Sequence, residues 1–309
     1  MSEQFKTGAG AGIDAAASTS AGRLASCSIV CERQAGVQLE GLLASLATGS
    51  PDLRIDLFDY APTDTLRTLA QRFGAHYVHQ PERPGSAHSH NLALRAAAQE
   101  GRRYHFVIDP GVQLPLDGVA RLQAWMEQHP DTGLLAPRVQ RANGQVWPLC
   151  RLLPHPLELL WLRCFPVLHL SSGRLARYQL HGSGYSREME VPVLPACCLL
   201  LRVQTALRAG LFDERLSHGF GNADLARRIA RGARVVFQPQ VAIVHNGRAD
   251  GASGRAHGRA LVSALRYFNK WGWLRDEERD RINARALRAS ESARVGRGAR
   301  IAARKDVLS

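Results

Sequence analysis

The stretch Tyr-His-Phe-Val-Ile-Asp-Pro-Gly-Val at residues 104–112 decides the fold, because a largely apolar run stops at an acid followed by proline and glycine. Continuous runs of this kind are typical of strands that are buried on both faces of a parallel sheet. Pro110 has no N–H for a strand ladder, so we expect the strand to end with Asp109 at its carboxyl end. Ligands bind at these ends in open α/β sheets, so Asp109 is either a site residue or the first residue of an Asp-Pro-Gly turn.

Strand patterns alternate with helix patterns on both sides of this stretch. The expected strands before it lie at residues 27–31, 55–58 and 77–78, and the expected helices at 37–46, 64–73, 88–99 and, after it, 117–128. This alternation predicts an α/β fold with a mostly parallel central sheet, flanked by helices and joined by right-handed crossovers.

The second half of the chain has shorter and weaker patterns. The expected strands lie at residues 134–139, 145–147, 191–201, 235–237 and 241–244, with helices at 203–209, 222–231 and 260–273. The first two strands flank an Asn-Gly pair and suggest a hairpin. Residues 152–189 have weak periodicity and predict a helix followed by a long irregular loop, which is often functional. Residues 246–258 are rich in glycine and predict a mobile loop.

These patterns divide the chain into four parts: a disordered leader at 1–25, an α/β domain at 26–258, an aromatic helix at 259–274 and a basic tail at 275–309. The tail is expected to be solvated or disordered. If it folds instead, four arginines share one helical face: Arg294, Arg297, Arg300 and Arg304.

Composition limits the class of protein. The chain has 309 residues, 45% of them hydrophobic and 22% charged, as expected of a soluble globular domain, and no apolar run is long enough to span a bilayer. Six cysteines without a Cys-x-x-Cys spacing, and a start without a secretion signal, predict a reduced cytoplasmic protein. The net charge of +13 predicts either an anionic partner or a solvated basic surface.

Short motifs in a fixed order resemble the family-2 glycosyltransferases, in particular the bacterial rhamnosyltransferase-like members, over residues 28–272. Asp59 with Asp64 matches an Asp-Asn-x-Ser-x-Asp segment of that family, and Gly85 with Asn91 matches its Asn-x-Gly loop and helix. Residues 108–112 occupy the place of its Leu-Asn-Pro-Asp segment. Further matches lie at residues 28–30, 126–133, 196–202, 210–214, 224–225, 244–245 and 266–272.

This resemblance implies a GT-A fold with a carboxyl-terminal helical extension, which binds a nucleoside-diphosphate sugar and transfers the sugar to an acceptor hydroxyl with inversion. It implies that Asp59 accepts a hydrogen bond from the nucleobase and that Asn91 lines the nucleotide pocket. From the residues alone, the alternatives are that Asp59 is a strand-end turn residue and that Asn91 is a helix cap. We expect Asp59, Asn91 and Asp109 to converge on one donor pocket.

The resemblance also implies a divalent metal, Mg²⁺ or Mn²⁺, on the diphosphate. Here the sequence departs from the family, because Gly111 stands where the family has its metal-binding acid and Asp109 occupies the preceding Asn position. Asp109 and His245 are the remaining candidate ligands. A hard cation held by one acid and one imidazole would bind weakly.

A second departure concerns the catalytic base. Asn222 stands where the family has its acid, and an amide does not accept a proton at neutral pH. Asp224 is the next acid along the chain, and it either replaces the missing base or binds the acceptor. Alternatively, it is an acid in the first turn of a helix, where the helix dipole favours it. His218 in the preceding loop is another candidate, with a suitable pKa range.

Three functions remain open. The first is a cytoplasmic glycosyltransferase of bacterial surface polysaccharide or glycolipid assembly, with a glycan or lipid-linked acceptor and a basic, aromatic carboxyl region in peripheral contact with an anionic membrane. The second is a degenerate, non-catalytic relative that binds a glycan or a partner enzyme, because Gly111 and Asn222 replace carboxylates. The third, a nucleic-acid binder, draws only on the net charge; without an RNA or DNA motif we expect no specific nucleic-acid partner.

Overall fold

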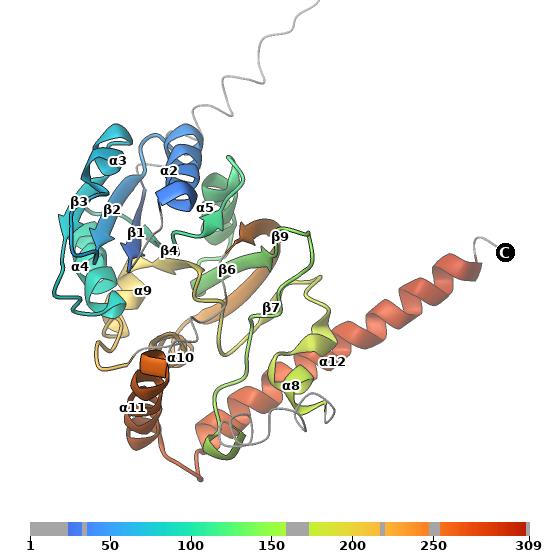
Figure 1. The fold of residues 1–309 in the computed structure, drawn as a ribbon. Helices are drawn as coiled ribbons and strands as arrows, with labels where there is room; N and C mark the ends of the chain where they lie inside the picture. Colours follow the sequence, from blue (N-terminus) through green and yellow to red (C-terminus); the bar gives the residue numbers. More distant parts are fainter. Residues whose placement is uncertain (1–23, 33–35, 159–172, 217–219, 247–253, 307–309) are drawn as a thin grey trace, which may run out of the picture.

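The computed structural model describes residues 24–32, 36–158, 173–216, 220–246 and 254–306. Its described part is built around a nine-stranded sheet with the order β3-β2-β1-β4-β8-β6-β9-β5, in which β7 also pairs with β9 (Figure 1). The strands are β1 Ala25–Cys31, β2 Arg54–Asp59, β3 His76–His79, β4 Tyr104–Ile108, β5 Val112–Gln113, β6 Thr132–Gln140, β7 Met189–Glu190, β8 Cys198–Arg202 and β9 Arg234–His245.

The predicted α/β fold with a mostly parallel sheet is confirmed. Strands β3, β2, β1 and β4 run parallel to one another, and β6 is parallel to β9. Strand β8 is antiparallel to both β4 and β6, and the short strands β5 and β7 are antiparallel to β9.

Helices cover both faces of the sheet. The helices are α2 Gly36–Gly49, α3 Arg67–Arg72, α4 Ser86–Gln99, α5 Gly118–Gln128, α8 Arg174–Tyr178, α9 Val203–Arg208, α10 Phe220–Ile229, α11 Gly254–Trp271 and α12 Glu277–Asp306, with a 3₁₀ turn at His181–Ser183. Apolar residues of α2 and α5 pack on one face, and those of α4, α9 and α10 pack on the other.

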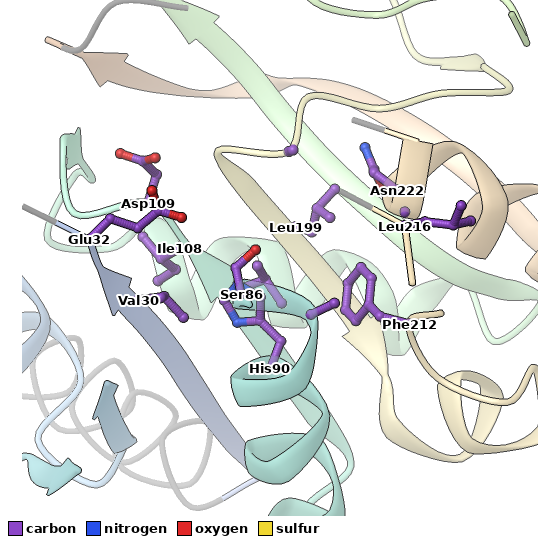
Figure 2. A pocket seen from close by; sticks show the side chains of 14 residues that line it. Val30, Glu32, Ser86, His90, Ile108, Asp109, Leu199, Phe212, Leu216 and Asn222 are labelled. Carbon is purple, nitrogen blue, oxygen red and sulfur yellow. The ribbon is translucent and has the colours of Figure 1, made fainter. Parts of the chain in front are cut away.

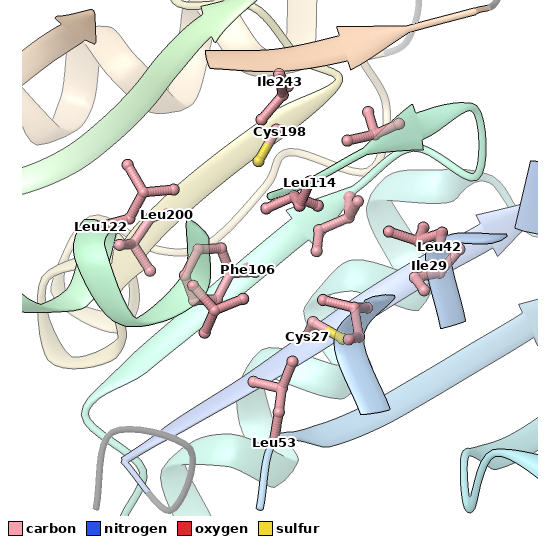
Figure 3. Close-up of a cluster of buried hydrophobic side chains, with 14 of the residues drawn as sticks. Cys27, Ile29, Leu42, Leu53, Phe106, Leu114, Leu122, Cys198, Leu200 and Ile243 are labelled. Atoms are coloured by element: carbon pink, nitrogen blue, oxygen red, sulfur yellow. The ribbon is translucent and has the colours of Figure 1, made fainter. Parts of the chain in front are cut away.

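Strand β4 shows why residues 104–108 are so apolar. Phe106 and Ile108 belong to the core beneath α2 and α5, whereas Val107 points to the opposite core beneath α4 and α10. Figure 3 shows Phe106 near Leu122 of α5 and Leu200 of β8. All five residues of the strand are buried, so the strand has no solvent-exposed face.

Four predicted strands differ from the structure in their bounds. Of residues 191–201, only the end forms β8, because Pro192 and Pro195 have no N–H to donate to a ladder. The strands expected at 235–237 and 241–244 are one strand, β9, whose register against β6 shifts between Pro137 and Arg138. Of the strand expected at 145–147, only Val146 forms a single bridge.

The helical predictions for the carboxyl region also need correction. The chain beyond Arg275 is helix α12 rather than a solvated or disordered tail, and its first turns are anchored because Arg279 and Ser290 are buried. Figure 1 shows the far end of α12 extending away from the sheet. Helix α11 begins at Gly254, within the loop expected at 246–258. Helix α3 is shorter than expected.

Some predictions fall on residues outside the described ranges. These are the leader at 1–23, much of the loop at 246–258, and residues 159–172 of the weakly periodic segment. The described helices include none that is both long enough and apolar enough to cross a lipid bilayer. The cysteines at positions 27, 31, 150, 197 and 198 are all free thiols, as predicted.

Candidate active site

A cavity of about 260 Å³ lies where β1 and β4 end (Figure 2). Residues after these two strands supply two acids, Glu32 and Asp109, and the first turns of α4 supply Ser86 and His90. The other lining residues are mainly apolar and come from the strands, the segment before β8, the loop before α10 and α10 itself: Val30, Ala87, Val107, Ile108, Ala196, Leu199, Phe212, Leu216, Gly221 and Asn222. The cavity therefore occupies the carboxyl edge of the parallel strands, as the sequence predicts for a ligand site.

Asp109 has one occupied oxygen and one available oxygen. Its Oδ1 accepts a hydrogen bond of 2.8 Å from the Gly111 N–H and lies 3.1 Å from Nε2 of His245. No described residue donates a hydrogen bond to Oδ2, and the side chain is 47% exposed. Burial raises the pKa of Asp109, but the hydrogen bonds from His245 and Gly111 outweigh it and leave the pKa below its ordinary value.

The structure brings the two predicted metal ligands, Asp109 and His245, into contact, but they do not form a complete site. Within the described ranges, the structure contains no group of three His, Cys, Asp or Glu side chains that could hold a metal ion. His245 Nε2 already contacts Asp109 and would have to leave it to coordinate a cation. The arrangement fits only a cation that brings further oxygen ligands with its substrate, as Mg²⁺ does with phosphates.

Asn222 lines the cavity from the beginning of α10, as expected for a residue near the reaction. Its Nδ2 donates a hydrogen bond to the Leu194 carbonyl, and the residue is only 7% exposed. Its buried Oδ1 has no hydrogen-bond partner among the described residues. A buried acceptor without a donor is costly, so Asn222 is a polar position that a ligand or water can satisfy.

Asp224 is fully buried in a cluster of ion pairs and is not among the residues that line the cavity. Arg228 donates to Oδ2 at 2.6 Å, while Trp271 donates to Oδ1 at 2.7 Å and Lys270 approaches the same oxygen to 2.8 Å. These partners join α10 to α11. To act as a base, Asp224 would have to break this cluster, and it does not line the cavity.

Asp59 and Asn91 do not line the cavity with Asp109. Asp59 is fully buried at the end of β2, where it accepts hydrogen bonds from the Ala61 N–H and the Tyr77 hydroxyl. Asn91 bonds both backbone groups of Phe212 and also donates to Glu214, so it ties α4 to the segment before α10. In this geometry, Asn91 shapes the cavity through Phe212, and a direct donor contact by Asp59 or Asn91 stays a prediction.

Two cavity residues, Glu32 and His90, were not predicted. Glu32 directly follows β1, and the strand-end argument that selects Asp109 also applies to it. His90 precedes Asn91 and lies one helical turn after Ser86, so helical spacing places both on one side of α4. His218, the third predicted catalytic candidate, lies outside the described residues.

Helix α4 directs its amino terminus at the cavity. It begins at Ser86 after Gly85, whose φ of 110° is a conformation that glycine adopts without strain. The first N–H groups of a helix lack intrahelical partners, and the helix dipole makes this end partly positive. Donors on α4 and carboxylates after β1 and β4 therefore line one cavity, a combination suited to a polar, phosphate-bearing ligand with an apolar part.

No protein-family model matches this sequence, and no match was found among the curated proteins. Solved structures do match the fold. A mannosyltransferase from Pyrobaculum calidifontis, in complex with GDP-Man and Mn²⁺, superposes with a TM-score of 0.52 at 17% identity, over 92% of this chain and 80% of that one.

Two further structures match with a TM-score of 0.56 each. One is residues 1–349 of S. aureus TarS in complex with UDP-GlcNAc, at 15% identity over 85% of this chain and 71% of that one. The other is GalNAc-T7 with UDP, GalNAc and Mn²⁺, at 14% identity over 80% of this chain and 48% of that one. At these identities the likeness concerns the fold, and the fold of this protein is that of the GT-A glycosyltransferases.

Proposed function

We propose that the protein is a glycosyltransferase, which holds a nucleoside-diphosphate sugar in this cavity and transfers the sugar to an acceptor hydroxyl with inversion. One observation carries the proposal: in a GT-A fold, the cavity at the ends of β1 and β4 places two carboxylates together with the amino terminus of α4. The amino terminus of a helix is well suited to phosphate, and the carboxylates supply the acid and base chemistry.

The donor's diphosphate lies at the amino terminus of α4 in this proposal. The N–H groups of Ser86 and Ala87 face it, and His90 lies one turn further along the same helix. Asp109 is ionised at neutral pH because its pKa is below the ordinary value, so it accepts hydrogen bonds from the sugar or contributes to a cation site.

A divalent cation fits the proposal only as part of the donor complex. Oδ2 of Asp109 would be its ligand from the chain, with diphosphate oxygens and water completing the coordination. His245 would hold Asp109 Oδ1 and so orient the carboxylate. When bound, the cation would neutralise charge on the departing diphosphate.

Glu32 is the residue we propose as the base. It is exposed, lines the cavity and pairs with no described residue, whereas Asn222 has no basic oxygen and Asp224 is held in ion pairs. Glu32 takes the proton of the acceptor hydroxyl as the hydroxyl oxygen forms its bond to the sugar carbon. The bond from that carbon to the phosphate oxygen breaks, and the nucleoside diphosphate leaves.

The relationship to the rhamnosyltransferase-like members of family 2, and a role in bacterial surface polysaccharide or glycolipid assembly, are part of this proposal and rest on the motif order. Contact with an anionic membrane surface is also a proposal. It is supported by the net charge of +13 and by exposed apolar side chains on α11, Leu261 and Leu265, near Arg266 and Lys270.

A second candidate is a non-catalytic protein that binds a glycan or a partner enzyme. It is favoured by Asn222, which stands in the place of the family's base, and by the ion pairs that hold Asp224. The two candidates differ in whether Glu32 supports turnover.

The test is donor screening with purified protein, using UDP-, GDP- and dTDP-sugars with a set of glycan acceptors, with and without Mn²⁺, read by thermal shift and by release of nucleoside diphosphate. A donor at about 100 times its Kd stabilises the folded state by about 2.7 kcal/mol. Glu32→Gln should keep this stabilisation and lose nucleotide release, while Glu40→Gln, an exposed acid on α2, should keep both. Stabilisation without release by the unmodified protein would support the second candidate, and no stabilisation by any donor would reject the first.

A further inference from the structure

A line of buried polar side chains runs from the cavity into the sheet. Nδ1 of His90 lies 2.8 Å from Oγ of Ser28, and the same Oγ lies 2.8 Å from Nε2 of His105. Nδ1 of His105 in turn lies 2.7 Å from Oγ of Ser26. Ser26, Ser28 and His105 are fully buried, so His90 is the member of the line that reaches the cavity.

Three elements hold this line in place. Ser26 and Ser28 alternate along β1 with Cys27 and Ile29, which pack in the core beneath α2, so the two serines point to the face covered by α4. His105 is the partner of Ser26 in the parallel register between β1 and β4. His90 reaches Ser28 from α4.

Both histidines are neutral at pH 7. Burial lowers the pKa of His90 to about 4, and burial together with the neighbouring His90 lowers the pKa of His105 to about 3. A neutral imidazole carries one N–H, so one ring nitrogen donates and the other accepts. Each serine hydroxyl likewise has one hydrogen to donate.

Only one direction of hydrogen bonding gives every hydroxyl hydrogen an acceptor within the line. Ser26 donates to Nδ1 of His105, Nε2–H of His105 donates to Ser28, and Ser28 donates to Nδ1 of His90. In the reverse direction the Ser26 hydroxyl has no acceptor among the described residues, and a buried donor without an acceptor is unfavourable. The preferred direction leaves the hydrogen of His90 on Nε2, the ring nitrogen remote from Ser28.

We propose that His90 presents Nε2–H to the cavity as a fixed, uncharged donor for an acceptor oxygen of the bound nucleoside diphosphate, in a tautomer set by Ser28, His105 and Ser26. The nature of the ligand rests on the proposed function, while the tautomer is a property of the free protein. The Asp109 carboxylate, which also lines the cavity, interacts electrostatically with His90. A donor fixed before binding lowers the ordering cost of binding.

The tautomer is measured by long-range ¹H–¹⁵N NMR of the full chain labelled in histidine, at pH 7 and without ligand. We expect Nε2 of both His90 and His105 at the shift of a protonated nitrogen. In Ser28→Ala, Nδ1 of His90 should move towards the position of a nitrogen that accepts no hydrogen bond. Ser89→Ala removes another fully buried serine, one that bonds Tyr60 and Gln80 instead, and should leave both rings unchanged.

A protonated Nδ1 on His90 in the unmodified protein would overturn the proposal, and so would an unchanged His90 spectrum in Ser28→Ala. These outcomes do not depend on whether the protein is an enzyme. The proposed function fails separately, if none of UDP, GDP and dTDP binds.

The ligand contact is tested by titrating the labelled protein with UDP, GDP and dTDP. The nucleotide that binds should shift Nε2 of His90 and leave the nitrogens of His105 nearly unmoved. His90→Ala should weaken its binding about tenfold, and His90→Gln, which retains a donor near the Nε2 position, should recover part of the loss. Binding that leaves Nε2 unshifted, or an unchanged Kd in His90→Ala, would overturn the contact.

Discussion

The cavity and the cluster of ion pairs around Asp224 contain similar polar side chains, but these differ in whether their oxygens already have partners. Asp109 and Asn222 line the cavity, and each has an oxygen without a partner among the described residues. In the cluster between α10 and the α11–α12 segment, both oxygens of Asp224 are engaged, and Arg227 pairs with Asp276 and Glu278. This difference shows that a carboxylate indicates a binding site only where one of its oxygens has no partner in the fold.

The cluster is a structural joint. Arg227 is 2% exposed and lies 2.5 Å from the carboxylate of Asp276, with its guanidinium 4.1 Å from the ring centroid of Trp271. Its partners lie on α11 and on the segment that starts α12, so the cluster fastens the carboxyl-terminal helices to α10. Among the described residues, no arginine pairs with the two carboxylates that line the cavity, which agrees with a role in binding.

The largest expected effect concerns the cavity. Glu32→Gln should lower kcat about 10³-fold, equivalent to about 4 kcal/mol, because the amide cannot take the acceptor proton. Steady-state kinetics would show the loss in kcat with little change in the donor's KM. Asp224→Asn provides the contrast: a loss of kcat with an intact free energy of unfolding would return the catalytic role to Asp224.

The next effect concerns the joint. Asp276→Asn leaves Arg227 buried without its full partner and should lower the free energy of unfolding by about 3 kcal/mol. Urea unfolding measures this change. Glu277→Gln nearby is the control, because Glu277 is exposed and its side chain pairs with no described residue, so its loss should cost less than about 0.5 kcal/mol. Equal effects of the two substitutions would contradict a buried joint.

The joint also predicts a pH dependence. Hydrogen bonds from Arg231, and then Arg227, lower the pKa of Glu278 to about 2, against 4.5 for an ordinary glutamate. Because the folded-state pKa is the lower one, the contribution is complete above about pH 4.5 and is lost as pH falls towards 2. Allowing for partial exposure, Glu278→Gln should be about 1–2 kcal/mol less stable than the parent at pH 6.

Urea unfolding at several pH values would follow that difference. It should shrink as the pH falls from 4.5 and be smallest near pH 2. A difference that stays constant from pH 6 to pH 3 would show that Glu278 acts through packing alone.

The smallest expected effect is at Asn222. Asn222→Ala removes one hydrogen bond, to Leu194, together with an oxygen that has no partner, so the free energy of unfolding should change by about 1 kcal/mol or less. The substitution should matter more for donor binding, measured by calorimetry. A loss of stability above about 3 kcal/mol would assign Asn222 to the joint rather than to the cavity.

The parts of the fold that could be predicted are those that depend on local pattern. Residues 104–108 are apolar because both faces of β4 are covered, and the same pattern placed Asp109 at the cavity. The missed features depend on contacts between distant residues. The arginine-rich composition after Arg275 suggested a solvated tail. The local sequence does not show that Asp276 pairs with Arg227, which lies 49 positions away.

The same limit applies to the site. An acid at the start of a helix gives the same sequence pattern whether it is catalytic or paired. Arg228 is a local partner of Asp224, but Lys270 and Trp271 come from α11 and are not visible in the local sequence. His90 was missed because its partner Ser28 lies 62 residues earlier on β1. Asp59 was chosen because its position matches a motif of the family it resembles, and that match does not reveal that the Tyr77 hydroxyl occupies its carboxylate.

A crystal structure with the nucleoside diphosphate that stabilises the protein most would test the central claim directly. We expect the diphosphate at the amino terminus of α4, within hydrogen-bonding distance of the Ser86 N–H and of His90 Nε2, on the same side of the sheet as Asp109. A nucleotide bound outside this cavity, for example beside α12, would contradict it.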